Sequence, residues 1–308
     1  MTAASFSGTQ RQSVPNALPW IIGALLAIAA MLPRCAQAQT QPRICIMNAD
    51  GTQMRTLAEM AGYTWHGSPH WSHDGKQIAF DGTQGGTELN HIFLVDAAGG
   101  EPRDIGLGSQ PSFSADDKQL CFYMHEGNPD DEKPGIYVMN ITGKGPQFIA
   151  PGIRPRWSGD GSRIAYVSPH DGANTIWIYS IVDAESKPIV SEEIAGLSSP
   201  PVWSRDGKQI AFLRRQPGKD LELCVVEADE KFTVTVKAKE QVASVSPCWL
   251  PGNKILFAIS QGGNSPAQPR WLDPDKADAP TPIPCSVSRF WDPNWSPDMK
   301  QIAFGCEP

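Results

Sequence analysis

One short pattern recurs six times along this chain and constrains its fold more than any other feature. Each copy has a proline, one variable residue and an aromatic anchor, and five copies continue with Ser-x-Asp, as in PHWSHDGKQIAF at 69–80. Successive anchors are 42, 44, 46, 46 and 46 residues apart. The six anchors are Trp71, Phe113, Trp157, Trp203, Trp249 and Trp295. A register that is kept six times indicates a repeat architecture.

Each repeat unit predicts four short strands. The Pro-x-Trp core forms the first strand, and the pair Asp74-Gly75 predicts a tight hairpin turn because both residue types accept positive φ angles. KQIAF forms the second strand, and HIFLVD at 91–96 is typical of the third. Four strands in a unit of this length are typical of a propeller blade. We therefore predict an all-β fold, a six-bladed β-propeller of four-stranded blades, over residues 39–308.

The two ends of the chain are predicted to share the last blade. The last core ends at Phe304, so this blade lacks its third and fourth strands, and ICIMNADG at 44–51 matches IYVMNITG at 136–143. N-terminal strands that complete the blade would protect its edges from aggregation. Cys45 and Cys306 then fall on neighbouring strands, in a register offset by two residues. A disulfide between them would lock the ring, and the sequence leaves open whether it forms.

The N-terminus has the pattern of an export signal. The apolar run 17–32 is followed by Ala36-x-Ala38, which predicts a secretory signal peptide over residues 1–38 with cleavage after Ala38. In the alternative the run stays uncleaved, as the chain's membrane anchor. The net charge of −7 and the lack of a basic stripe argue against nucleic acid. We expect a periplasmic or secreted monomer.

The repeated P-x-W-S-x-D-G-x-x-I-A-F, followed by I-Y-V-M-N, resembles the WD40-like repeat of TolB-type β-propellers over residues 43–304. The resemblance implies a periplasmic or secreted propeller that works by binding partners. Similar repeats occur in prolyl-oligopeptidase-type peptidases, whose hydrolase motif G-x-S-x-G is absent from this sequence. They also occur in oligogalacturonate lyases, which use a histidine-bound metal.

The reactive residues of the repeat predict structure rather than catalysis. Ser72, His73 and Asp74 are adjacent and cannot form a triad, because neighbouring strand side chains point to opposite faces. His66 and His70 lie close by, either as inter-blade residues or as ligands of a metal gathered from several blades. Residues just before each strand-one core are expected to line one mouth of the channel. The candidates are His66, Arg154, Phe290, Trp291 and Asp292.

The sequence therefore predicts a non-enzymatic scaffold that binds a protein, peptide or glycan at one propeller face, with no catalytic residue, cofactor or metal. The alternative is a metal-dependent polysaccharide lyase or hydrolase with its site at the channel mouth. That alternative requires His, Glu or Gln side chains from several blades to converge on one point. A third interpretation is capture of small sugars, which predicts stacked aromatic side chains at the mouth.

Overall fold

The computed structural model describes most of the repeat region. The described residues are 42–170, 173–189, 197, 199–216, 218–228, 233–239, 241–250, 252–260, 267–276, 278–283 and 289–307. The predicted signal peptide, 1–38, lies outside them. Within these ranges no helix is long and apolar enough to cross a membrane.

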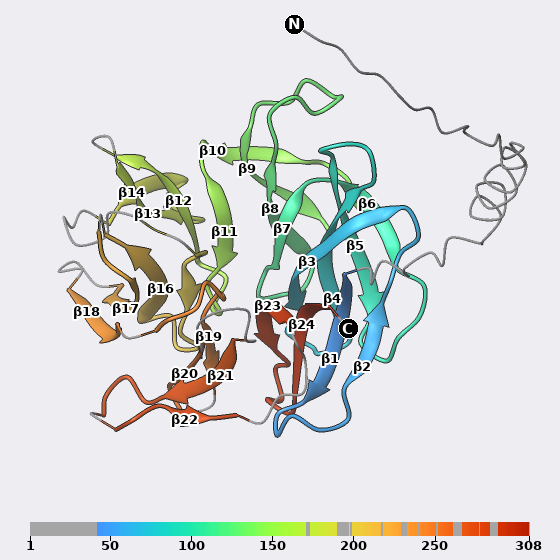
Figure 1. Ribbon diagram of the computed structural model, residues 1–308. Helices are drawn as coiled ribbons and strands as arrows, with labels where there is room; N and C mark the ends of the chain where they lie inside the picture. The colour runs from blue at the N-terminus through green and yellow to red at the C-terminus, as the bar shows by residue number, and fades with distance from the viewer. Residues whose placement is uncertain are drawn as a thin grey trace, which may run out of the picture. The chain divides into compact units, whose positions relative to one another are not determined.

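The described strands form six antiparallel sheets of four strands each, which are the blades of the predicted propeller. Figure 1 shows the sheets arranged around a common centre, with the first strand of each blade innermost. Blade 1 contains β3 (Tyr63–Trp71), β4 (Gln77–Gln84), β5 (Asn90–Asp96) and β6 (Arg103–Leu107). Blade 2 contains β7 (Ser109–Phe113), β8 (Gln119–Met124), β9 (Gly135–Asn140) and β10 (Gln147–Ala150). Blade 3 contains β11 (Ile153–Trp157), β12 (Arg163–His170), β13 (Ala173–Ser180) and β14 (Glu185–Pro188).

The remaining blades follow the same order, except where the ring closes. Blade 4 contains β15 (Val202–Trp203), β16 (Gln209–Arg215), β17 (Leu221–Glu227) and β18 (Val234–Ala238). Blade 5 contains β19 (Cys248–Leu250), β20 (Lys254–Ile259), β21 (Gln268–Leu272) and β22 (Thr281–Pro282). Blade 6 combines β23 (Arg289–Trp295) and β24 (Gln301–Glu307) with β1 (Arg43–Asn48) and β2 (Arg55–Ala58).

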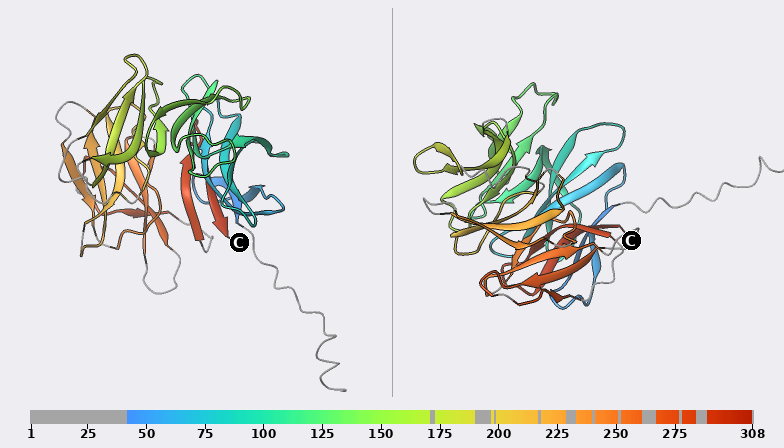
Figure 2. Two further views of the ribbon diagram at one scale, coloured as in Figure 1. Left: turned by 90° about the horizontal axis from the view of Figure 1, so that it is seen from above. Right: turned by 60° about the vertical axis from the view of Figure 1, so that its left-hand side comes forward.

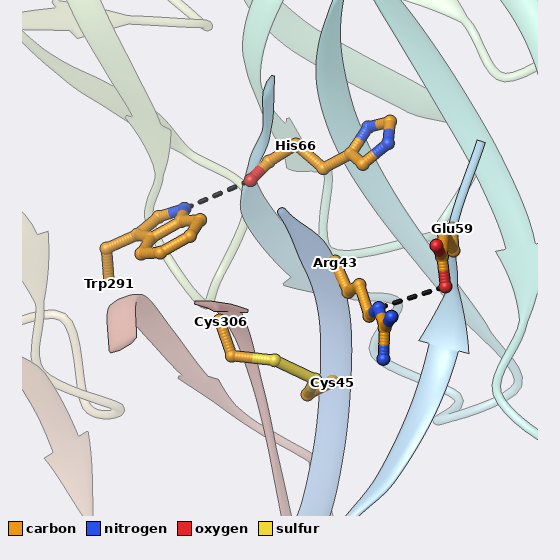
Figure 3. The surroundings of a disulfide bond; sticks show 6 residues. All are labelled: Arg43, Cys45, Glu59, His66, Trp291 and Cys306. Atoms are coloured by element: carbon orange, nitrogen blue, oxygen red, sulfur yellow. Dashed lines mark hydrogen bonds and ion pairs between the residues drawn. A yellow bond between two sulfur atoms is a disulfide. The ribbon is translucent and has the colours of Figure 1, made fainter. Parts of the chain in front are cut away.

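Blade 6 confirms that the N-terminal strands complete the last blade. Its strand order is β2-β1-β24-β23, and both Figure 1 and the turned views of Figure 2 show blue β1 beside red β24. Cys45 is paired with Phe304 and Arg43 with Cys306, which is the predicted offset of two residues. Cys45 and Cys306 nevertheless form a disulfide, with their Cα atoms 6.2 Å apart (Figure 3). The bridge joins β1, the first described strand, to β24, the last.

A bulge interrupts the first strand of four blades and accommodates the repeated proline there. The ladder register shifts between Gly67 and His70 in β3, and at the equivalent places in β7, β11 and β23. The residue just before the proline has a positive φ in each case. These residues are Ser68, Gln110, Arg154 and Asp292. Because proline cannot donate to a ladder, a bulge is where an inner strand accommodates it.

The bulges lie between the two faces of the propeller. We call the side with the Ser-x-Asp turns the turn face; its turns are 72–76, 114–118, 158–162, 204–208 and 296–300. We call the opposite side, where second strands lead into third strands, the loop face; its loops include 85–89 and 125–134. Residues before a bulge lie toward the loop face, and the anchors lie toward the turn face.

The turns differ from the predicted tight Asp-Gly hairpin. Five residues, 72–76, separate β3 from β4, and only Gly75 has a positive φ. Asp74 instead accepts hydrogen bonds from Ser72 Oγ and the backbone N–H of Lys76. Ser72 Oγ in turn accepts the N–H of Gln77, at 2.9 Å. The serine and aspartate recur because they satisfy the backbone of this longer turn.

Candidate binding sites at the two ends of the channel

A pair of stacked tryptophans lies on the loop face, where blade 6 meets blade 1. The ring centroids of Trp65 (β3) and Trp291 (β23) are 4.6 Å apart, with 20° between the planes. Trp291 Nε1 donates to the carbonyl of His66 at 3.0 Å, as Figure 3 shows. A Cβ at Gly67 would lie 2.8 Å from Trp65 Nε1, and one at Gly305 would overlap the Trp291 ring. Glycine at both positions therefore makes the stack possible.

Trp65 is the exposed member of this pair, with 42% of its surface accessible. The sequence candidates included Trp291 but missed Trp65, which stands six residues before its anchor in a strand that is otherwise polar toward solvent. The available signal was a tryptophan outside the repeated core, at a position where blade packing does not require an aromatic side chain.

His66 lies beneath this surface and is fully buried. Its Nε2 accepts the backbone N–H of Met60 at 3.3 Å, while Nδ1 has no partner among the described residues. Burial lowers the pKa of His66, which keeps the ring neutral. His66 thus supports the stacked pair through its carbonyl and presents little of its ring to a partner.

Asp292 connects three blades at the bulge. Its carboxylate accepts the backbone N–H of Ser68 in blade 1 at 3.3 Å and the hydroxyl of Ser246, just before blade 5, at 2.7 Å. Phe290 points elsewhere: its ring packs edge-on against Phe304 in a cluster that includes Met47. The structure therefore brings Trp291, Asp292 and His66 together and leaves Phe290 in the blade core.

Arg154 belongs to a group of interacting charges near the bulges, together with Arg156, Asp81 and Asp292. Burial lowers the pKa of both arginines, and Asp292 opposes this shift. Burial also raises the pKa of Asp81 to about 6, and Asp292 adds to the shift. Asp81 Oδ2 accepts the N–H of Gln110, but Oδ1 has no partner among the described residues. Asp81 and Arg156 were missed because their positions vary between repeats.

The turn face carries a cavity of about 370 Å³ at its centre. Its walls include five of the six anchors: Trp71, Trp157, Trp203, Trp249 and Trp295. These indoles also pack between blades; Trp249, for example, contacts a cluster that includes Leu213 of blade 4 and Phe257 of blade 5. The anchors thus have two roles, because they fill the junctions and line a hollow.

Ser72, His73 and Asp74, at this face, form hydrogen bonds within their own turn and with the turn of blade 2. Asp117 stands where three other turns have glycine, and its carboxylate accepts the backbone N–H groups of His73 and Asp74 at 2.6 and 2.8 Å. His73 Nδ1 lies 3.2 Å from the same carboxylate. His73 therefore pairs the turn of blade 1 with that of blade 2.

His70 likewise links two blades. Its Nδ1 accepts the backbone N–H of Phe113, and its Nε2 lies 3.3 Å from Ser112 Oγ. Burial lowers the pKa of His70 to about 3, and the charge of Arg156 adds to the effect. In the part of the chain that the structure describes, no three His, Cys, Asp or Glu side chains are grouped to hold a metal ion.

Comparison with known proteins gives consistent matches. Residues 136–307 match the family model described as the TolB beta propeller domain. The Tol-Pal system protein TolB of Francisella tularensis subsp. mediasiatica (strain FSC147) is 28% identical over 155 residues, which are 48% of this chain and 35% of that protein. The match thus spans about a third of that relative's length.

Two solved structures share the fold. TolB from Acinetobacter baumannii aligns with a TM-score of 0.62 and 19% identity, over 86% of this chain and 63% of that one. A candidate TolB from Agrobacterium tumefaciens aligns with a TM-score of 0.65 and 19% identity, over 87% of this chain and 98% of that one. At these identities the likeness is one of fold.

Proposed function

Because this chain belongs to the TolB beta propeller domain family, we propose that it is a non-enzymatic propeller that binds a protein or peptide partner outside the cytoplasm. The observation that carries the proposal is the exposed Trp65, stacked on Trp291 at the loop face. The partner docks on this pair, with Asp292 beside it as a polar contact.

The stacked pair has the properties of an interface anchor. Tryptophan is enriched among the residues that dominate binding energy, since it buries a large area at a low cost in side-chain entropy. Trp291 is fixed by its hydrogen bond to His66, so Trp65 rests on a rigid support. A preorganised aromatic surface loses little freedom when a partner covers it.

Three observations support a location in the bacterial envelope. Residues 1–38 have the sequence pattern of an export signal. The Cys45–Cys306 disulfide is the kind of bond that persists in oxidising compartments. The relative from Francisella is named as a Tol-Pal system protein. We propose a periplasmic monomer whose partner is a protein of that compartment.

The test compares Trp65→Ala with Phe148→Ala, a matched variant because Phe148 is 41% exposed but lies on β10, the outer strand of blade 2. Each purified protein is immobilised and exposed to a bacterial envelope fraction, and retained polypeptides are quantified. We expect a polypeptide that wild type and Phe148→Ala retain equally, and that Trp65→Ala retains at least about tenfold less. Equal retention by all three, or retention of oligosaccharide without polypeptide, contradicts the proposal.

A further inference from the structure

The turn-face cavity combines apolar walls with rigid supports. Its five indoles are joined by Val202 and Met299. Two of the indoles are fixed by hydrogen bonds, from Trp203 Nε1 to Arg156 O at 3.1 Å and from Trp249 Nε1 to Val202 O at 2.8 Å. The volume is in the range of small-ligand pockets, and the walls are already in place.

The charge of the lining is one-sided. Arg156 and Arg205 contribute to it, and none of the described residues that line it is an aspartate or glutamate, although the chain has 33 acidic and 26 basic residues. The nearby turn aspartates accept hydrogen bonds within their own turns. Asp206 and Asp298, for example, each accept a serine hydroxyl and a backbone N–H, which lower the pKa of each carboxyl.

Arg156 is held in place by backbone carbonyls. Its Nη1 donates to the carbonyls of Gln110 at 3.2 Å and Pro155 at 2.8 Å. Among the ion pairs of the described residues, none joins a carboxylate to Arg156 within 4.0 Å; Asp292 and Asp81 act on it from farther away. A guanidinium has five N–H donors, so a fixed Arg156 keeps donors for a two-pronged contact with a carboxylate.

The other polar side chains of the lining add no competing negative charge. His70 is neutral because burial lowers its pKa to about 3, and its Nδ1 is occupied by the N–H of Phe113. Asn294 Oδ1 accepts the N–H of Trp71. The cavity therefore presents the half-buried, hydrogen-bonded guanidinium of Arg156 beside indole surface, with Arg205 also in its lining.

From this arrangement we infer that the cavity binds the C-terminal carboxylate of a peptide whose last side chain is apolar. The carboxylate contacts the guanidinium of Arg156, and the side chain packs on the indoles. An acidic residue inside a chain fits less well, because its flanking peptide groups would be desolvated against apolar walls. The C-terminal end of a peptide, by contrast, can enter the cavity with its carboxylate leading. This site is separate from the loop-face pair of the proposed function.

The experiment uses two probes that differ in one group: N-acetyl-Gly-Leu-Leu with a free carboxylate, and the same peptide as its C-terminal amide. Binding is measured by calorimetry and by the fluorescence of the cavity tryptophans, on the full chain. We expect wild type to bind the acid about 10- to 100-fold more tightly than the amide. Equal affinity, or no binding of the acid at millimolar concentration, overturns the inference.

Single substitutions test whether the carboxylate binds at Arg156. Arg156→Gln should remove the preference for the acid, whereas Arg103→Gln, at an exposed arginine of β6, should keep it. Trp65→Ala should also keep it, so failure here and failure of the loop-face proposal are distinguishable. If Arg156→Gln does not fold, the acid–amide comparison on wild type still decides the matter. Acetate or phosphate binding as tightly as the acid would indicate a simple anion site and would overturn the inference too.

Discussion

From blade 6 through blades 1 and 2 to blade 3, each junction is held by a side chain that accepts a backbone N–H. The accepting side chain belongs to the residue just before one anchor, and the donor is the next blade's anchor. The three bonds run from Trp71 N to Asn294 Oδ1 at 2.9 Å, from Phe113 N to His70 Nδ1 at 3.3 Å, and from Trp157 N to Ser112 Oγ at 3.1 Å.

At the junctions from blade 3 to blade 5, the anchor donates through its indole N–H rather than its backbone N–H. We call these indole-type junctions. The residues before the anchors are Arg156 and Val202, whose side chains cannot accept a hydrogen bond. Here the indole N–H of the next anchor donates to the backbone carbonyl of that residue, from Trp203 to Arg156 and from Trp249 to Val202. At the last junction the thiol of Cys248 stands beside the N–H of Trp295, and burial raises the pKa of this thiol to about 12.

The difference shows that a single variable position selects how two blades are joined. Each tryptophan anchor has two donors, the backbone N–H and the indole N–H. Where the backbone N–H is used, at Trp71 and Trp157, the indole N–H finds no acceptor among the described residues. The predictions below separate the two kinds of junction, starting with the largest effect.

Trp203→Ala should destabilise the protein by about 3–5 kcal/mol, because it removes a buried ring from an indole-type junction and leaves a cavity. Trp203 is only 7% exposed and packs with Ile176 of blade 3 and Phe212 of its own blade. Chemical denaturation measures the loss. A value below about 1 kcal/mol would show that the anchor does not hold the junction.

Ring closure should matter about as much as one junction. Cys45→Ser with Cys306→Ser should cost about 2–4 kcal/mol, because the disulfide joins residues 261 positions apart and restricts the unfolded chain. Denaturation with and without reductant tests this: reductant should bring wild type to the stability of the double variant and leave the variant unchanged. If reductant leaves wild type unaffected, strand pairing between β1 and β24 is sufficient for closure.

The repeat made the fold predictable, whereas the junctions depend on residues that the repeat does not share. The anchors, the closing strands and even the two-residue offset of Cys45 and Cys306 follow from alignment of the six copies. Asp81 and Arg156 do not, because each occurs in one blade and gains its role only when the ring brings it beside a neighbour. Trp65 pairs with Trp291 across 226 positions of sequence, a contact that no local pattern encodes.

At a junction where a side chain accepts the backbone N–H of the next anchor, loss of that side chain should cost about 1–3 kcal/mol, since a buried N–H is left unpaired. The variants are Ser112→Ala and Asn294→Ala, measured by chemical denaturation. Cys248→Ala is the matched change at the last junction and should cost less, because a thiol is a weak acceptor. Equal losses at all three positions would mean that volume, not hydrogen bonding, sets the stability.

The His70 junction should weaken in acid. The pKa of His70 is lowered in the folded state to about 3, so the unfolded chain binds the extra proton as pH falls below about 6.5. Stability from this group is therefore complete above pH 6.5 and decreases toward pH 3, by about 1–2 kcal/mol at pH 5. His70→Asn keeps an acceptor, as Asn294 does, and should flatten the stability profile between pH 6.5 and 5. An unchanged profile would contradict the link.

Removal of the indole N–H alone is expected to have the smallest effect, and it distinguishes the two junction types most directly. Trp249→Phe and Trp157→Phe remove the same N–H from anchors that are 6% and 8% exposed, so similar area is lost. Trp249 loses a hydrogen bond to Val202 O, whereas Trp157 loses a buried donor without a partner among the described residues. Trp249→Phe should therefore be more destabilising, by about 1 kcal/mol. Trp203 is less suitable for this comparison, because Arg163 stacks on its ring at 4.5 Å. Equal losses in urea denaturation would mean that the indole bond adds nothing to the junction, and that packing alone joins blades 3 to 5.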